Sequence, residues 1–150
     1  MRKFVYVILA SWALCLACGA QEGEWLTDLT KAKDKARADK KMVLIDFNGS
    51  DWCPPCKALR KDVFSSPQFV AYAKTNLVLV DIDFQLHKEQ TEELKRANQA
   101  LAEKFGVEGY PTVVVLSSEG SELKKETGYS GQSAKEFISQ LERLRMKDKS

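Results

Sequence analysis

The chain has 150 residues, of which 44% are hydrophobic and 29% are charged. This length supports one domain with a substantial core, and the composition is that of a soluble globular protein. The formal net charge of +2 depends on Arg2 and Lys3, which we expect to be removed with an export signal, and the remaining basic residues then equal the 21 acidic ones. Because this balance leaves no basic excess, we expect neither nucleic acid nor an anionic membrane as a partner.

The first twenty residues have the pattern of a secretory signal peptide. The segment begins with two basic residues, continues with an apolar run at 4–16 and ends with small residues at 18–20. The run is too short for a comfortable transmembrane helix, and cleavage after Gly19 or Ala20 fits the pattern. We therefore expect residues 1–20 to be a signal peptide and the protein to be periplasmic or secreted.

A lipid anchor at Cys18 is the alternative interpretation of this segment. Ala17 precedes Cys18, which fits a lipidation signal, but Cys15 occupies the position at which lipidation signals usually carry leucine. We therefore favour simple cleavage over lipidation.

Hydrophobic periodicity and helix-start signals predict the elements in the first half of the mature chain. Apolar residues at three- and four-residue steps favour a helix, a near-continuous apolar run favours a strand buried on both faces, and prolines mark helix starts. In chain order, the predicted elements are a helix over 25–38, a strand over 42–47, a turn over 48–51, a helix over 54–63 and a short helix from Ser66–Pro67.

The second half is predicted by the same signals. Ser133 and Glu136 form a capping box that should begin the last helix, and residues after Met146 are expected to fray. The predicted elements are a strand over 77–84, a charged amphipathic helix over 87–105 that stops at Gly106, strands over 111–116 and 123–127, and a helix over 133–144.

This order of elements predicts a single α/β domain over residues 21–146, with a frayed tail at 147–150. Helices between the first three strands imply parallel crossovers, and the tight turn near Gly120 implies a hairpin. The expected architecture is a mixed sheet of four to five strands sandwiched by helices.

The four cysteines form two pairs with a two-residue spacing. Cys15 with Cys18, and Cys53 with Cys56, could suggest a zinc site with two knuckles. The first pair lies in the export segment, however, and the single His87 is a poor third ligand, so we expect neither a metal nor another cofactor. The mature chain then keeps two thiols, which in an oxidising compartment form either a structural staple or a redox device.

The context of Cys53 and Cys56 favours redox chemistry. The pair follows a buried strand and opens a helix, where unpaired N–H groups and the positive end of the helix dipole stabilise a thiolate. We expect Cys53 to be the exposed nucleophile with a low pKa and Cys56 to be the shielded resolving thiol. Pro54 and Pro55 lack N–H groups, so the N–H of Cys56 is the expected donor to the Cys53 sulfur.

The alternative is a purely structural disulfide across one helical turn. Such a bond closes a very short loop and constrains the unfolded chain little, so it adds little stability. A stabilising bridge would be better placed between distant segments.

Two motifs lie next to predicted strands: Trp52–Cys56 follows one strand, and Gly109-Tyr110-Pro111-Thr112 precedes another. Over residues 41–144 the chain resembles the thioredoxin superfamily, which implies a three-layer α/β/α sandwich. The double-proline motif is similar to that of exported members, including those that reduce apocytochrome c. The lead-in at 49–52 is more similar to proteins related to the C-terminal domain of the transmembrane disulfide reductase.

The resemblance also implies substrate-binding residues. Pro111 would lie in cis beside the cysteine pair, where the neighbouring backbone receives an extended peptide by strand-like pairing. Tyr110 would shape the peptide groove, and Trp52 would be an exposed platform against the substrate. An ordinary trans proline and two packed aromatic residues are the alternatives.

Asp46 is an acid inside an apolar strand, which is costly unless the group is paired or protonated. In thioredoxins a buried acid beneath the second cysteine relays its proton, and the resemblance implies that role here. Asp46 precedes Cys53 by seven residues, one more than in thioredoxin itself, so a structural acid at the strand end is the alternative.

These observations predict an enzyme that exchanges disulfides with substrate proteins. We favour a reductant, which receives electrons from a membrane-bound donor, over an oxidant. We expect a monomer. A thioredoxin-fold module that only binds peptides is the alternative from another class. The Lys- and Glu-rich stretch at 88–104 is longer than in a minimal thioredoxin and is either a solvated face or a docking surface.

Overall fold

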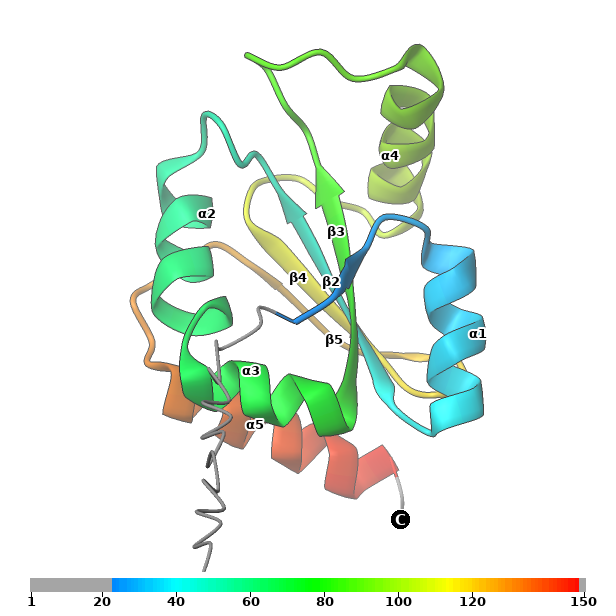
Figure 1. Ribbon diagram of the computed structural model, residues 1–150, viewed down its shortest axis with the longest axis vertical. Coiled ribbons are helices and arrows are strands. Elements are labelled where there is room, and N and C mark those ends of the chain that lie inside the picture. The colour runs from blue at the N-terminus through cyan, green and yellow to red at the C-terminus, as the bar shows by residue number, and fades with distance from the viewer. Residues whose placement is uncertain (1–22, 149–150) are drawn as a thin grey trace, which may run out of the picture.

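The computed structural model describes residues 23–148 (Figure 1). The elements are β1 (Trp25–Leu26), α1 (Leu29–Asp39), β2 (Met42–Asn48), α2 (Pro54–Leu59), a π-helical turn (Arg60–Phe64), α3 (Pro67–Asn76), β3 (Leu77–Asp83), α4 (Glu92–Lys104), β4 (Thr112–Leu116), β5 (Glu122–Thr127) and α5 (Ala134–Asp148). The predicted signal peptide at 1–20, with Cys15 and Cys18, lies outside the described residues.

The strands form one mixed sheet in the order β1-β3-β2-β4-β5. β2 pairs with β3 in parallel and with β4 antiparallel, and β4 and β5 form the predicted hairpin. The α/β fold class is therefore confirmed.

The predicted parallel crossover into β4 is wrong. α4 lies at the end of the sheet where β3 stops, and Asn98 on α4 donates a hydrogen bond to the carbonyl of Asp83, the last residue of β3 (Figure 1). Because the helix does not run back along the sheet, the chain enters β4 from the end at which it left β3.

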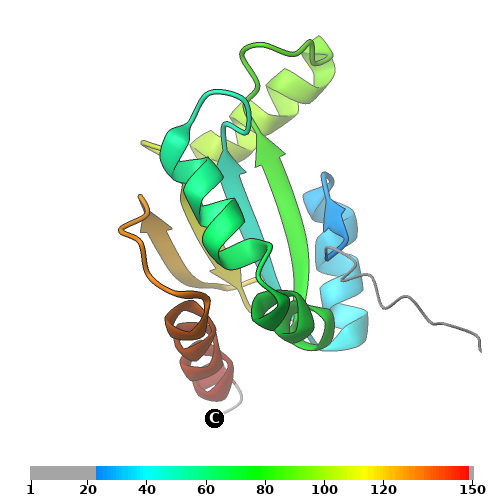
Figure 2. The same cartoon turned by 60° about the vertical axis from the view of Figure 1, so that its left-hand side comes forward.

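Helices cover both faces of the sheet, with α1 and α4 on one face and α2, α3 and α5 on the other (Figures 1 and 2). Alternate residues of β2 point to opposite faces: Val43 and Ile45 pack with α1 and α4, and Met42 and Leu44 pack with the other three helices. Asp46 shares the parity of Met42 and Leu44. The alternation therefore places its side chain in the layer between the sheet and α2.

The start of the domain differs from the predicted helix over 25–38. Trp25 and Leu26 form a short strand paired in parallel with β3, and the helix begins at Leu29. Asp28 begins it, because its carboxylate accepts hydrogen bonds from the N–H groups of Thr30 and Lys31 at 2.9 and 3.2 Å.

The predicted helix over 87–105 begins later, at Glu92. Thr91 caps it by accepting a hydrogen bond from the N–H of Leu94 at 3.2 Å. The preceding segment is a loop at the end of β3, because hydrogen bonds to Asp51 and Trp52 hold its backbone away from helical geometry.

The capping box of the last helix is present, since Ser133 and Glu136 exchange hydrogen bonds at 2.8–3.3 Å. α5 continues through Asp148 and so includes the first two residues of the expected frayed tail. In the described part of the chain, no helix combines the length and apolar character needed to cross a bilayer.

Candidate active site

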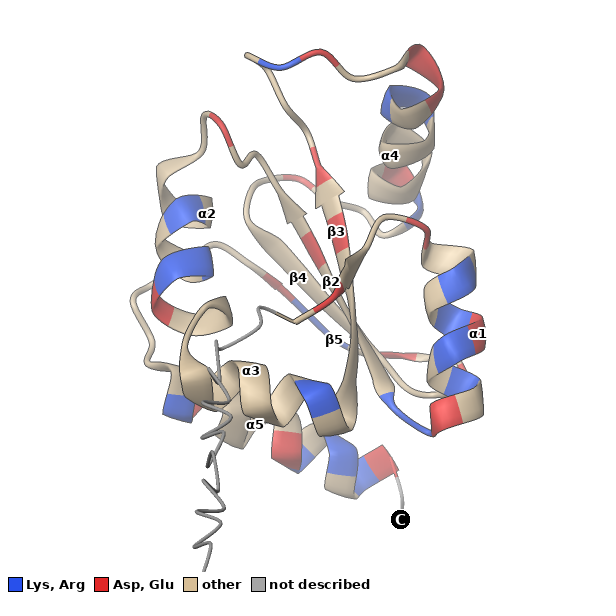
Figure 3. Ribbon diagram, viewed as in Figure 1, with Lys and Arg blue, Asp and Glu red and all other residues tan. Residues whose placement is uncertain are grey.

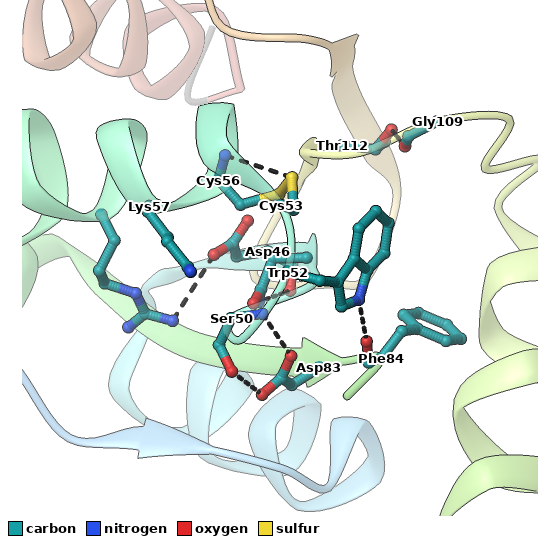
Figure 4. The surroundings of a disulfide bond; sticks show 12 residues. Asp46, Ser50, Trp52, Cys53, Cys56, Lys57, Asp83, Phe84, Gly109 and Thr112 are labelled. Atoms are coloured by element: carbon teal, nitrogen blue, oxygen red, sulfur yellow. Dashed lines mark hydrogen bonds and ion pairs between the residues drawn. A yellow bond between two sulfur atoms is a disulfide. The ribbon is translucent and has the colours of Figure 1, made fainter. Parts of the chain in front are cut away.

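Cys53 is the N-cap residue of α2 and has an extended backbone, with φ −94° and ψ 104°. Its sulfur accepts a hydrogen bond from the N–H of Cys56 at 3.3 Å, as the sequence predicted (Figure 4). The geometry follows from the two prolines, which supply no N–H and leave Cys56 as the first donor of the helix. A negative charge on this sulfur meets both that donor and the positive end of the helix dipole.

Cys53 and Cys56 form a disulfide, with their Cα atoms 5.3 Å apart. The expectation that Cys53 is exposed is wrong for this oxidised form, because Cys53 is only 3% exposed, whereas Cys56 is shielded as expected, at 4%. Trp52, which directly precedes Cys53, is itself half-buried. What distinguishes the two cysteines is therefore hydrogen bonding and position on the helix.

A cavity of about 310 Å³ reaches Cys56, which sequence reasoning did not anticipate. Three basic side chains, Lys57, Arg60 and Lys61, line it. Two of these cations already have partners: Lys57 donates a hydrogen bond to the Asp51 carbonyl, and Arg60 is ion-paired with Asp46 and Asp81.

Trp52 is half-buried and held in place, whereas the resemblance implied an exposed platform. Its indole Nε1 donates to the carbonyl of Phe84 at 2.6 Å (Figure 4). Its ring also meets Tyr110 edge to face, with centroids 5.7 Å apart. Gly49 is required next to it, since a Cβ at that position would clash with the indole. The Trp52 side chain is thus held by Phe84, which follows β3, and by Tyr110, which precedes β4.

Tyr110 and Pro111 lie at the start of β4, and the peptide bond between them is cis. Thr112 pairs with Phe47 across the sheet, which brings this loop beside the end of β2 where the cysteine loop begins. The Thr112 hydroxyl donates to the Gly109 carbonyl at 2.7 Å and closes the loop on itself. Burial raises the pKa of Tyr110, so its hydroxyl stays neutral at physiological pH.

Asp46 is 2% exposed, and its carboxyl group points from β2 toward the first turn of α2 (Figure 4). Burial raises its pKa to about 7, an effect that the positive charge of Arg60 opposes and the charges of Asp81 and Asp83 reinforce. Its Oδ1 atom has no hydrogen-bond partner among the described residues. A carboxyl group with this pKa exchanges protons readily near neutral pH.

Arg60 is a residue that sequence reasoning missed. Its guanidinium lies 3.6 Å from the carboxylate of Asp46 and 3.2 Å from that of Asp81, and it stacks on the Trp25 ring at 4.1 Å. Arg60 follows Cys56 by four residues and so lies on the same face of the helix. That spacing was a usable signal, but the partners come from β1, β2 and β3 and are not close in the sequence.

Asp81 completes this cluster. It lies directly opposite Asp46 in the β2–β3 register and accepts a hydrogen bond from the side-chain amide of Asn48 at 2.6 Å. Within residues 23–148, no group of three or more His, Cys, Asp or Glu side chains is placed to hold a metal ion.

Comparison with known proteins gives a consistent result. Residues 29–145 match the sequence profile of the thioredoxin-like domain. The chain is 33% identical over 99 residues to the thioredoxin-related protein DsbJ of Chlamydia pneumoniae, and the match covers 66% of this chain and 28% of DsbJ. It is 32% identical over 95 residues to the disulfide bond reductase DsbH of the same organism, which covers 63% of this chain and 57% of DsbH. The chain therefore spans only part of either relative.

Solved structures show the same likeness. The DsbH oxidoreductase superposes with a TM-score of 0.76 at 25% identity, covering 84% of this chain and 86% of that one. The oxidised C-terminal domain of DsbD from Neisseria meningitidis superposes with a TM-score of 0.59 at 27% identity, covering 81% of this chain and 99% of the domain.

Proposed function

The chain belongs to the thioredoxin-like domain family, and on this premise we propose that it is a thiol–disulfide oxidoreductase that reduces disulfides in other proteins. The observation that carries the proposal is the position of Cys53, which caps α2 and accepts the N–H of Cys56 at 3.3 Å. A structural disulfide does not need a sulfur at a helix N-terminus. A nucleophilic thiolate is stabilised at that position.

The reaction begins with the reduced dithiol. The Cys53 thiolate attacks one sulfur of a partner disulfide, forms a mixed disulfide and releases the other partner sulfur as a thiolate, which takes up a proton. Cys56 then loses its proton and attacks the Cys53 sulfur, so the second partner thiol leaves. Two electrons pass to the partner, and the protein ends as the Cys53–Cys56 disulfide.

Asp46 is the proposed acceptor of the Cys56 proton. It lies in the layer beneath α2, and its raised pKa lets it accept and return a proton near pH 7. Arg60 holds the carboxylate in place and limits how far burial raises the pKa.

Trp52, Tyr110 and Pro111 are the proposed substrate-binding residues. Trp52 directly precedes Cys53 and meets the ring of Tyr110, so the two aromatic side chains flank the approach to the redox pair. The backbone beside Pro111 pairs with an extended peptide in the manner of an added strand.

Export and the direction of electron flow are also parts of the proposal. The N-terminal pattern of residues 1–20 supports export. An exported enzyme of this kind needs a membrane-bound dithiol donor to regenerate its reduced form. The likeness to a protein named as a disulfide bond reductase supports the reducing direction. We propose a monomer that acts on substrate proteins and needs no organic cofactor or metal.

Insulin reduction with dithiothreitol as electron source tests this proposal. We expect the protein to accelerate precipitation of the insulin B chain and the Cys53→Ser/Cys56→Ser double variant to do nothing. The reduction potential of the unaltered protein, measured against glutathione, should lie closer to about −270 mV than to about −120 mV.

Two results would contradict the proposal in different ways. Peptide binding without cysteine-dependent turnover would indicate a non-catalytic binding module. A potential near the oxidising end of that range would preserve the enzyme and overturn the reducing direction.

A further inference from the structure

The loop over residues 84–91, between β3 and α4, is tied to the residues that lead into Cys53. The indole of Trp52 donates to the Phe84 carbonyl at 2.6 Å, and the Phe84 N–H donates to the Asn48 carbonyl at 2.8 Å. The loop is thus bonded directly to the segment that carries the nucleophile.

Asp51 fixes the tip of the same loop. Its carboxylate accepts the N–H of Leu86 at 3.1 Å and the N–H of His87 at 2.6 Å. Desolvation raises the pKa of Asp51, but the hydrogen bonds from His87 and Leu86, with the further lowering contributions, together outweigh it and bring the pKa below its usual value. Asp51 therefore stays charged and keeps the tip in one conformation, which reduces the entropy that binding would otherwise cost.

The fixed loop forms one wall of a cleft of about 760 Å³, here called the β3–α4 cleft. Its lining residues come from the cysteine loop, the 84–91 loop, the first half of α4 and the residue before Pro111. They include Trp52, Phe84, Leu86, Lys88, Arg96 and Tyr110.

One side of the β3–α4 cleft is aromatic. Tyr110 contacts Trp52 with ring centroids 5.7 Å apart and Phe84 with centroids 5.2 Å apart, so the three rings form one surface. This surface begins beside Cys53 and Pro111, which means that a chain joined to Cys53 by a disulfide has a direct route into the cleft.

Leu86 stands at the rim of the cleft with 69% of its surface exposed, although its own N–H and that of His87 are held by Asp51. Exposing a leucine on a rigid loop is not needed for folding. Apolar side chains on a rigid rim are what a partner's own apolar side chain can bury.

The lining of the cleft also contains three cations. Lys88, Lys95 and Arg96 line it, against Glu89 as the acid among the lining residues, and Figure 3 shows these charges on the loop and on the first turns of α4. Lys95 also pairs with Glu92 at 2.8 Å, so Lys88 and Arg96 are the cations best placed to meet a partner.

We propose that the β3–α4 cleft selects substrates by binding the polypeptide segment next to their reacting cysteine, and that this segment carries an apolar side chain together with acidic residues. The inference rests on the proposed function, since it places the segment by its link to Cys53. The apolar side chain packs against Leu86 and the three rings, and the acidic side chains meet Lys88 and Arg96.

The test uses two peptides that contain the same single cysteine, joined by a disulfide to neutral 2-mercaptoethanol. In one peptide a leucine and three aspartates flank the cysteine on either side, and in the other lysines replace the aspartates. We expect the protein to reduce the acidic peptide with a kcat/KM at least about tenfold higher in 50 mM salt, and the ratio to fall toward one in 0.5 M salt, where screening is strong.

Matched variants assign this preference to the cleft. Lys88→Glu/Arg96→Glu should abolish or reverse the preference. Lys135→Glu/Arg143→Glu, which makes the same change of charge on exposed positions of α5 across the sheet, should retain it. Leu86→Ser should lower kcat/KM about tenfold for the leucine-containing acidic peptide and much less for a version with serine in place of leucine.

Reduction of bis(2-hydroxyethyl) disulfide, a small neutral substrate, is measured alongside. Failure of the unaltered protein to reduce it would refute the proposed function itself. Turnover of that substrate with equal kcat/KM for the two peptides, or a preference that survives in the Lys88→Glu/Arg96→Glu variant, would overturn the inference about the cleft alone.

Discussion

Replacing Cys53 with serine should lower disulfide reduction by roughly 10³-fold or more, whereas replacing Cys56 with serine should stop the reaction after its first step. Cys53 caps α2 and accepts the Cys56 N–H, so the attacking thiolate forms at this position. Without Cys56 no second sulfur displaces the partner, and the mixed disulfide accumulates. Mass spectrometry of each variant after incubation with an oxidised substrate protein measures the adduct.

The two serine variants control for each other. Both lose a disulfide that closes a very short loop, so both should keep nearly the stability of the reduced protein, and urea unfolding checks this. Adduct formation in the Cys53→Ser variant and not in the Cys56→Ser variant would reverse the assigned roles.

The second large effect concerns Asp46. Its pKa is about 7 in the folded protein and 3.8 when unperturbed, so between these values the folded protein binds more protons than the unfolded chain. Stability from this group is therefore fully present below about pH 4 and falls as the pH rises through 7. Asp46→Asn removes this dependence. We expect the free energy of unfolding of the variant, relative to the unaltered protein, to increase by about 2–3 kcal/mol between pH 5 and pH 8.

Urea unfolding of the oxidised proteins at the two pH values gives this difference. Asp34→Asn, a change of the same kind on the exposed face of α1, is the matched control and should show no such increase. A constant difference between the Asp46→Asn variant and the unaltered protein across this range would contradict a carboxyl group with a raised pKa. In the reduced protein, the same substitution should slow the release of substrate from the mixed disulfide near neutral pH, because Cys56 loses its proton acceptor.

Local sequence determined the parts of the site that could be predicted. The two prolines after Cys53 set both the helix start and the donor to its sulfur, and these signals act within four residues of one another. The capping box at Ser133 is local in the same way. The buried strands were also predictable, because a short, near-continuous apolar run such as that of β2 is typical of a strand covered on both faces.

The remaining features depend on contacts between distant segments. The 84–91 loop has a helical pattern from residue 87, but Asp51 takes the N–H groups of Leu86 and His87 and delays the helix to Glu92. The direction of β4 depends on where α4 packs, and periodicity carries no information on that point.

The Asp46 cluster shows the same limit within the site. A buried acid was evident from the sequence, but its ion pair with Arg60 and the stacking of Arg60 on Trp25 join three segments that only the fold brings together. The low exposure of Cys53 also escaped prediction, since Trp52 is anchored to the Phe84 carbonyl instead of standing free.

The most direct test of the account is the pH dependence of alkylation of the reduced protein by iodoacetamide, followed residue by residue with mass spectrometry. We predict that Cys53 reacts first and that its rate titrates with an apparent pKa well below the ordinary thiol value of about 8.5. Faster reaction at Cys56, or a Cys53 pKa at or above that value, would contradict the claim that the start of α2 activates Cys53.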